Sequence, residues 1–110
     1  MNTIFSYLYR DASNYKLFHE EIIHGELTLE QIQPYLDQNL YFIPAVIGMK
    51  ALEFEVWDQN EDHDWHEIEL LTLTDKEPTI ELSADEIISK LKQNQPIQTH
   101  SLKTADLKGL

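Results

Sequence analysis

Cysteine is absent from this 110-residue sequence, and its absence removes several kinds of site at once. Without a thiol, the chain has no disulfide, no thiolate metal site and no cysteine nucleophile. A chain without cysteine also suits a reducing compartment, and we therefore expect a cytoplasmic protein.

Glycine and long apolar runs are also scarce. The three glycines form no phosphate-cradling loop, and the chain contains no Gly-x-Ser-x-Gly elbow. No apolar run approaches the length of a membrane-spanning helix, and the first residues lack the basic region and apolar core of a signal peptide. The sequence therefore indicates no cofactor and no membrane association.

Basic residues are outnumbered, with eight Lys and Arg against twenty Asp and Glu, and the formal net charge is −12. Such a field repels nucleic-acid phosphates and attracts basic proteins or cations. Residues 51–75 contain nine acids and no Lys or Arg, whereas residues 87–110 contain four lysines and one acid. We expect no nucleic-acid partner; a basic protein partner and a purely solubilising acidic surface remain as alternatives.

Local signals at the start of the chain predict a β-hairpin. Residues 3–10 and 15–24 are rich in aromatic and aliphatic side chains, as strands are. Between them, residues 11–14 read Asp-Ala-Ser-Asn, and Asp and Asn side chains favour turns because they bond to their own backbone.

Two helix starts share one capping pattern. Thr28 with Gln31, and Ser83 with Glu86, each place a hydroxyl three residues before a side chain that completes a capping box. Pro34 removes a backbone hydrogen bond early in the first helix, which must therefore be short or kinked.

Two runs of alternating residues, 51–57 and 65–74, flank an acidic stretch and predict a second hairpin. With Trp57 opposite Trp65, one face is almost wholly apolar, and a shift by one residue would set glutamates against the core. The outer face would then carry Glu53, Glu55, Trp57, Trp65, Glu67 and Glu69.

That outer face needs an explanation, because directly opposed like charges cost up to about 1 kcal/mol per pair. Solvent can screen them, the chain's own Arg10, Lys16 or later lysines can cover them, or a basic partner can bind. Tryptophan favours the partner, since indole faces attract cations and anchor interfaces. The expected partner-binding residues are Glu53, Glu55, Trp57, Glu61, Asp62, Asp64, Trp65, Glu67 and Glu69.

A metal site is the alternative use of the same region. His63 and His66 have a His-x-x-His spacing beside several acids, which suits zinc when both lie on one helix face. In a strand, however, residues three apart point to opposite faces, so we expect His66 to be a core histidine. If a metal does bind near His63, the alternative function is a small metal-dependent enzyme centred on residues 61–67.

Three stretches together resemble a family of small bacterial proteins without an established function. They are Tyr-Arg-Asp-Ala-Ser-Asn-Tyr-Lys at residues 9–16, Phe-Ile-Pro-Ala-Val-Ile-Gly at residues 42–48, and Glu-Asp-His-Asp-Trp-His-Glu-Ile at residues 61–68. The resemblance brings no mechanism. It implies a single small domain in which Arg10, Asn14, Lys16, Trp65, His66 and Glu67 converge in space.

These observations predict one α+β domain over residues 1–110, in which an antiparallel sheet of four or five strands packs against two short helices. Residues 93–110 have weak periodicity, and we expect little regular structure there. The pattern favours a binding protein over an enzyme. Such a protein would mask a basic surface of a partner, as an immunity protein, an antitoxin or an inhibitory nucleic-acid mimic does.

Overall fold

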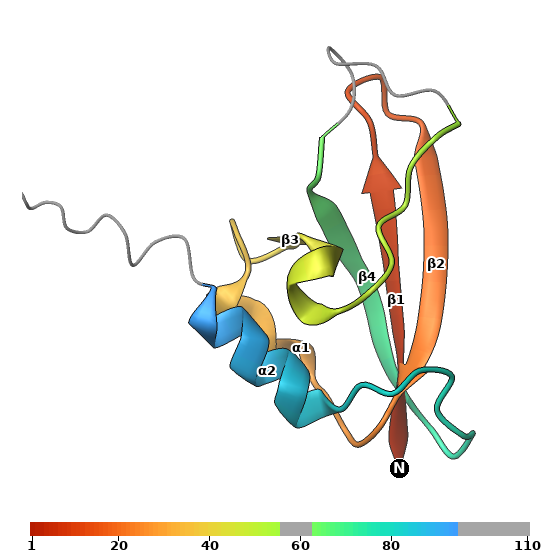
Figure 1. Ribbon diagram of the computed structural model, residues 1–110, viewed down its shortest axis with the longest axis vertical. Helices are drawn as coiled ribbons and strands as arrows, with labels where there is room; N and C mark the ends of the chain where they lie inside the picture. The colour runs from red at the N-terminus through yellow and green to blue at the C-terminus, as the bar shows by residue number, and fades with distance from the viewer. Residues whose placement is uncertain (56–62, 95–110) are drawn as a thin grey trace, which may run out of the picture.

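The computed structural model describes residues 1–55 and 63–94, and it confirms the α+β class. Four strands form one antiparallel sheet, and two α-helices lie to one side of it (Figure 1). The elements are β1 Asn2–Arg10, β2 Lys16–Ile23, α1 Leu29–Ile32, η1 Gln33–Tyr35, β3 Tyr41–Phe42, η2 Pro44–Ile47, β4 His66–Thr74 and α2 Ala84–Gln93, where η denotes a 3₁₀ helix.

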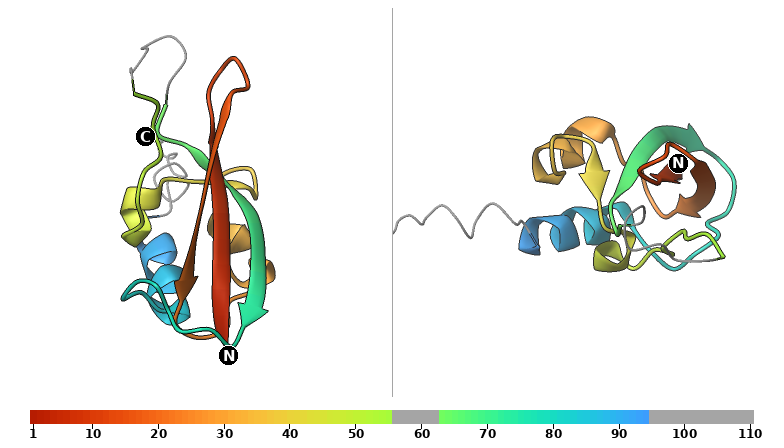
Figure 2. Two further views of the ribbon diagram at one scale, coloured as in Figure 1. Left: turned by 90° about the vertical axis from the view of Figure 1, so that its right-hand side faces the viewer. Right: turned by 90° about the horizontal axis from the view of Figure 1, so that it is seen from above.

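The strand order is β2-β1-β4-β3, so the first and last long strands of the described chain are neighbours. The sheet curls, and beyond the short β3 the strand β4 forms one of its borders (Figure 2). The pairing of β1 with β4 shifts between Ser6 and Tyr7, which leaves Glu69 without a counterpart on β1. The short β3 pairs with only the first two residues of β4.

The β1–β2 hairpin forms as its turn residues predict. The Asp11 carboxylate accepts hydrogen bonds from the main-chain N–H groups of Ser13 and Tyr15, both at 2.9 Å. Asn14 adopts a left-handed conformation with φ of 71°, which Asn tolerates better than most residues.

Both predicted helix starts are present. Ser83 and Glu86 exchange side-chain to main-chain hydrogen bonds of 3.0 and 3.1 Å, and α2 then runs for ten residues. At α1, the Thr28 N–H donates to the Gln31 side chain at 2.9 Å. The helix ends after four residues and continues as η1, which contains Pro34.

The hydrophobic core lies between one face of the sheet and the helices. Phe5, Tyr7 and Tyr9 of β1 alternate toward this face and are fully buried, together with Ile87 of α2. Their rings pack edge-on against neighbouring aromatic residues such as Phe42. Within the described residues, no helix is both long and apolar enough to cross a membrane.

The predicted second hairpin is wrong. Residues 51–55 form no strand, and β4 pairs instead with β1 on one side and β3 on the other. Glu67 lies opposite Leu8 and Tyr41 rather than Glu55, because both edges of β4 are already occupied at that point. Trp57, the proposed partner of Trp65, lies outside the described residues.

Candidate functional site

The residue that organises the candidate site is Arg10, the last residue of β1. Its guanidinium donates two hydrogen bonds to the Glu67 carboxylate, from Nε at 2.7 Å and from Nη2 at 3.2 Å. Nη1 donates to Oδ1 of Asn14 in the turn. The planar guanidinium group therefore ties the β1–β2 turn to β4 and neutralises Glu67.

His63 connects the chain before β4 to the end of β1. Its main-chain N–H donates to the Tyr9 hydroxyl at 3.1 Å, and its Nε2 lies 2.8 Å from the Arg10 carbonyl oxygen. The Trp65 N–H donates to Nδ1 at 3.1 Å, so Nε2 must carry the proton of the neutral ring. These bonds hold the main chain at Trp65 in place, and so set the position from which its indole side chain projects.

Asp37 reaches the same region from a tight turn before β3. Gln38 and Asn39 both have positive φ angles, 51° and 62°, and they reverse the chain. Asp37 and Tyr41 then exchange main-chain hydrogen bonds of 2.9 Å in both directions. Among residues 1–55 and 63–94, none donates a hydrogen bond to the exposed Asp37 carboxylate.

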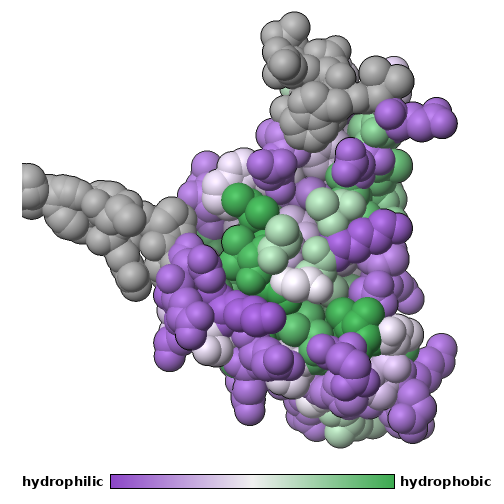
Figure 3. Space-filling view, in the orientation of Figure 1, coloured by the Kyte–Doolittle hydropathy of each residue, from purple (hydrophilic) through white to green (hydrophobic). Residues whose placement is uncertain are grey.

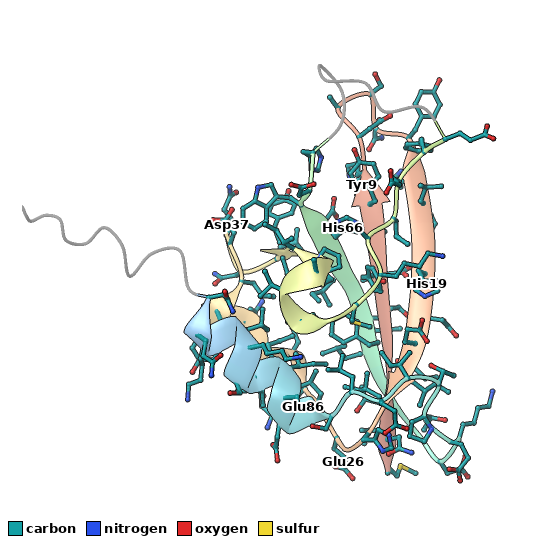
Figure 4. All side chains as sticks on the ribbon, in the orientation of Figure 1. Tyr9, His19, Glu26, Asp37, His66 and Glu86 are labelled. Carbon is teal, nitrogen blue, oxygen red and sulfur yellow. The ribbon has the colours of Figure 1, made fainter. Side chains whose placement is uncertain are left out.

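Together these segments surround an open depression of about 410 Å³, which we call the acidic hollow. Figure 4 shows Asp37 on the side of the molecule away from His19 and β2. The Trp65 side of the hollow is accessible, since that residue is 36% exposed. The lining residues are Arg10, Asp11, Asp37, Gln38, Tyr41, His63, Trp65 and Glu67.

The charge of the acidic hollow is negative overall. Three carboxylates, those of Asp11, Asp37 and Glu67, surround one guanidinium, and that guanidinium is already bonded to Glu67. Asp37 and Asp11 are therefore the charges left for a ligand. Two aromatic rings, Trp65 and Tyr41, line the same depression, and this combination suits a cation.

A second, apolar hollow of about 190 Å³ adjoins the first. The two share Asp37 and Trp65, so the indole stands between them. Apolar surface is visible on this face of the molecule, bordered by hydrophilic residues (Figure 3). The lining residues are Tyr35, Asp37, Phe42, Ile43, Val46, Trp65, Leu91 and Asn94.

His66 is a core histidine, as the strand pattern predicts, with 1% of its surface exposed. It packs against Tyr9 with ring centroids 5.2 Å apart, and the two lie side by side in Figure 4. Nε2 accepts the Leu52 N–H at 2.9 Å, so Nδ1 must hold the proton that faces the Asp64 carbonyl oxygen at 2.9 Å. Burial lowers the pKa of His66 below its ordinary 6.5.

The ring nitrogens of both histidines of the proposed metal site therefore already have hydrogen-bond partners. Each ring nitrogen of His63 and His66 is bonded to a main-chain group or faces one at hydrogen-bond distance. The described part of the chain contains no group of three or more His, Asp or Glu side chains arranged to hold a metal ion.

The expected partner-binding residues do not form one surface. Trp65 and Glu67 line the acidic hollow, whereas Glu69 lies at the irregularity of β4, beside a different depression. Glu53 and Glu55 are exposed on the segment that forms no strand, and Asp64 is exposed next to Trp65. Trp57, Glu61 and Asp62 lie outside the described residues.

The sequence patterns missed Asp37 and Tyr41, the two residues that complete the hollow. Their signal was the Asp-Gln-Asn run at residues 37–39, which is typical of a tight turn immediately before a strand. The convergence implied by the family resemblance is found for Arg10, Asn14 and Glu67. The chain matches no protein-family model, no curated protein and no solved structure.

Proposed function

We propose that this chain is an acidic binding protein that docks on a basic surface of a protein partner, as an immunity protein, an antitoxin or a nucleic-acid-mimic inhibitor does. The observation that carries the proposal is the position of the Asp37 carboxylate. It lies in a depression lined by Trp65 and Tyr41, and no described residue bonds to it.

A partner's Arg or Lys side chain fits the chemistry of this depression. The carboxylates of Asp37 and Asp11 attract its charge, and the face of an indole adds about 0.5–2 kcal/mol depending on solvent exposure. The net charge of −12 would accelerate the encounter with a basic surface, and salt would screen that attraction.

Two contacts support binding over metal-dependent catalysis. His63 and His66 both use their imidazoles to hold the main chain in place, through Trp65 and Leu52 respectively. A metal ion would have to displace those bonds, and the displaced Leu52 N–H is buried. The histidines therefore support the shape of the acidic hollow, and Asp37 and Trp65 supply its binding groups.

Calorimetric titration with two short peptides tests the proposal. One carries two arginines, and the matched peptide carries citrulline, which keeps the shape of arginine without its charge. We expect the arginine peptide to bind, the citrulline peptide to bind much more weakly, and added salt to weaken the arginine complex.

Matched variants locate the contact. Asp37→Asn and Trp65→Leu should each weaken binding of the arginine peptide severalfold. Glu77→Gln removes the same charge as Asp37→Asn from the loop beyond the other end of β4, and it should leave binding nearly unchanged. Equal losses in Asp37→Asn and Glu77→Gln would reduce the interaction to general charge attraction and count against the acidic hollow.

A further inference from the structure

The two borders of the sheet differ in how they are protected. Exposed strand edges offer unpaired main-chain groups to other chains, and soluble proteins usually protect them with charges or a covering segment. The β2 border has both. It carries Lys16, Glu20 and Glu21, and Thr79 bonds to both main-chain groups of Ile22, at 2.7 and 2.8 Å.

The β4 border has neither form of protection over most of its length. β3 pairs with His66 and Glu67, and the Ile68 N–H donates to the Leu40 carbonyl at 3.3 Å. From Glu69 to Thr74, no other described residue makes a main-chain hydrogen bond on the side away from β1. Figure 2 shows the end of β4 at the border of the molecule.

After Glu69, the side chains along this border are uncharged, and three of the five are leucines. Residues 70–74 read Leu-Leu-Thr-Leu-Thr, in a chain whose net charge is −12. Leu70 is 59% exposed on the outer face of the sheet, and Leu73 is 48% exposed on the face that carries the helices. Leu29 of α1 is also exposed, beside a depression of about 240 Å³ along β4.

We infer that β4 pairs with β4 of a second copy of this chain, so that two sheets join across a twofold axis. A second copy fits because the strand is complementary to itself. Antiparallel pairing centred on Leu71 sets Leu70 opposite Thr72 and Glu69 opposite Leu73, so no two acids face each other over residues 69–73. The added strand would cover Leu70 on one face and Leu73 on the other.

Salt dependence separates this contact from the proposed partner site. Two copies that each carry −12 repel each other, so added salt should strengthen self-association through an uncharged edge. The same salt should weaken the capture of a basic partner. Each interaction can therefore fail without the other.

Sedimentation of the 110-residue chain over a wide concentration range tests the inference. We expect the mass to double as concentration rises, at lower concentration when salt is added. Thr72→Lys places a charge in the centre of the exposed border and should return the protein to monomer. Ser89→Lys adds the same charge on an exposed position of α2 and should leave the dimer intact.

Hydrogen exchange on the unmodified protein locates the contact independently of any variant. The main-chain amides of residues 69–74 that point away from β1 should gain protection as concentration rises, whereas the outward amides of residues 16–20 should not. A monomer at every concentration and salt level, or a dimer unaffected by Thr72→Lys, would overturn the inference. So would complete protection of these outward amides in the monomer, because another segment of the same chain would then cover the border.

Discussion

The main-chain N–H of Leu52 donates a hydrogen bond to Nε2 of His66, and the two nitrogen atoms lie 2.9 Å apart in the protein interior. This bond holds the segment after η2 against β4 without strand pairing. His66→Phe should lower the free energy of unfolding by about 1–3 kcal/mol, because a buried N–H is left without an acceptor. Urea denaturation measures the loss, and His24→Gln, at a more exposed histidine, should change stability by no more than about 0.5 kcal/mol.

The same histidine predicts how stability depends on pH. Its pKa is 6.5 in the unfolded chain and lower in the folded protein, mainly because burial disfavours the charged ring. Below pH 6.5 the unfolded chain therefore binds a proton that the folded protein does not. The free energy of unfolding should fall as the pH decreases from 6.5 toward the folded-state pKa, by up to about 1.4 kcal/mol per pH unit.

A denaturation series across this pH range checks the prediction, and His66→Phe is the control that lacks the titrating group. A second decline below pH 4.5 should persist in that variant. Although burial opposes it, hydrogen bonds from Thr79 and His19 hold the pKa of Glu21 below its ordinary 4.5, so this carboxylate stabilises the fold only while ionised. An unchanged decline between pH 6.5 and 4.5 in His66→Phe would assign that titration to another residue.

The elements that sequence predicts well are those whose signals lie within a few residues of one another. The turn after Arg10 depends on Asp11 bonding two N–H groups close by, and α2 starts where Ser83 and Glu86 exchange bonds. Each device works without knowledge of the rest of the fold. Such features can be read from a short window of sequence.

Strand pairing between distant segments is what sequence did not reveal. The alternation at residues 51–55 resembles a strand, yet these residues form none. Leu52 is buried, and its N–H donates to the His66 side chain instead of to a neighbouring strand. Both edges of β4 pair with other strands, β1 and β3, which lie far from it in the sequence. The acidic hollow could not be predicted from the sequence for the same reason. Strand pairing brings Arg10, Asp37 and Trp65 together from distant parts of the chain.

Tyr7 predicts a loss of stability at high pH. Its hydroxyl donates to the Lys50 carbonyl oxygen at 2.5 Å, and burial, together with the nearby charge of Glu21, raises its pKa to about 12 from 10. Above pH 10 the unfolded chain loses a proton that the folded protein retains. The free energy of unfolding should therefore fall between pH 10 and about 12, and Tyr7→Phe should remove this component.

Denaturation at increasing pH measures this fall in the free energy of unfolding, and tyrosinate absorbance recorded in parallel follows the ionisation of the tyrosines. In the folded protein, Tyr7 should ionise at a higher pH than a tyrosine of the unfolded chain. If Tyr7→Phe left the late-ionising group in place, the raised pKa would belong to a different phenol.

The capping bond of Ser83 should stabilise α2 and the part of the core that this helix forms. Its hydroxyl oxygen accepts the Glu86 N–H at 3.1 Å, and Ser83→Ala should cost about 1 kcal/mol in the free energy of unfolding. Ser89→Ala on the exposed side of the same helix is the matched control, and it should be neutral or slightly stabilising because alanine favours helices. Because Ile87 and Leu91 pack into the core from α2, the cost should appear in the global unfolding transition rather than as local fraying. A Ser83→Ala variant as stable as Ser89→Ala would show that the helix is held by its packing alone.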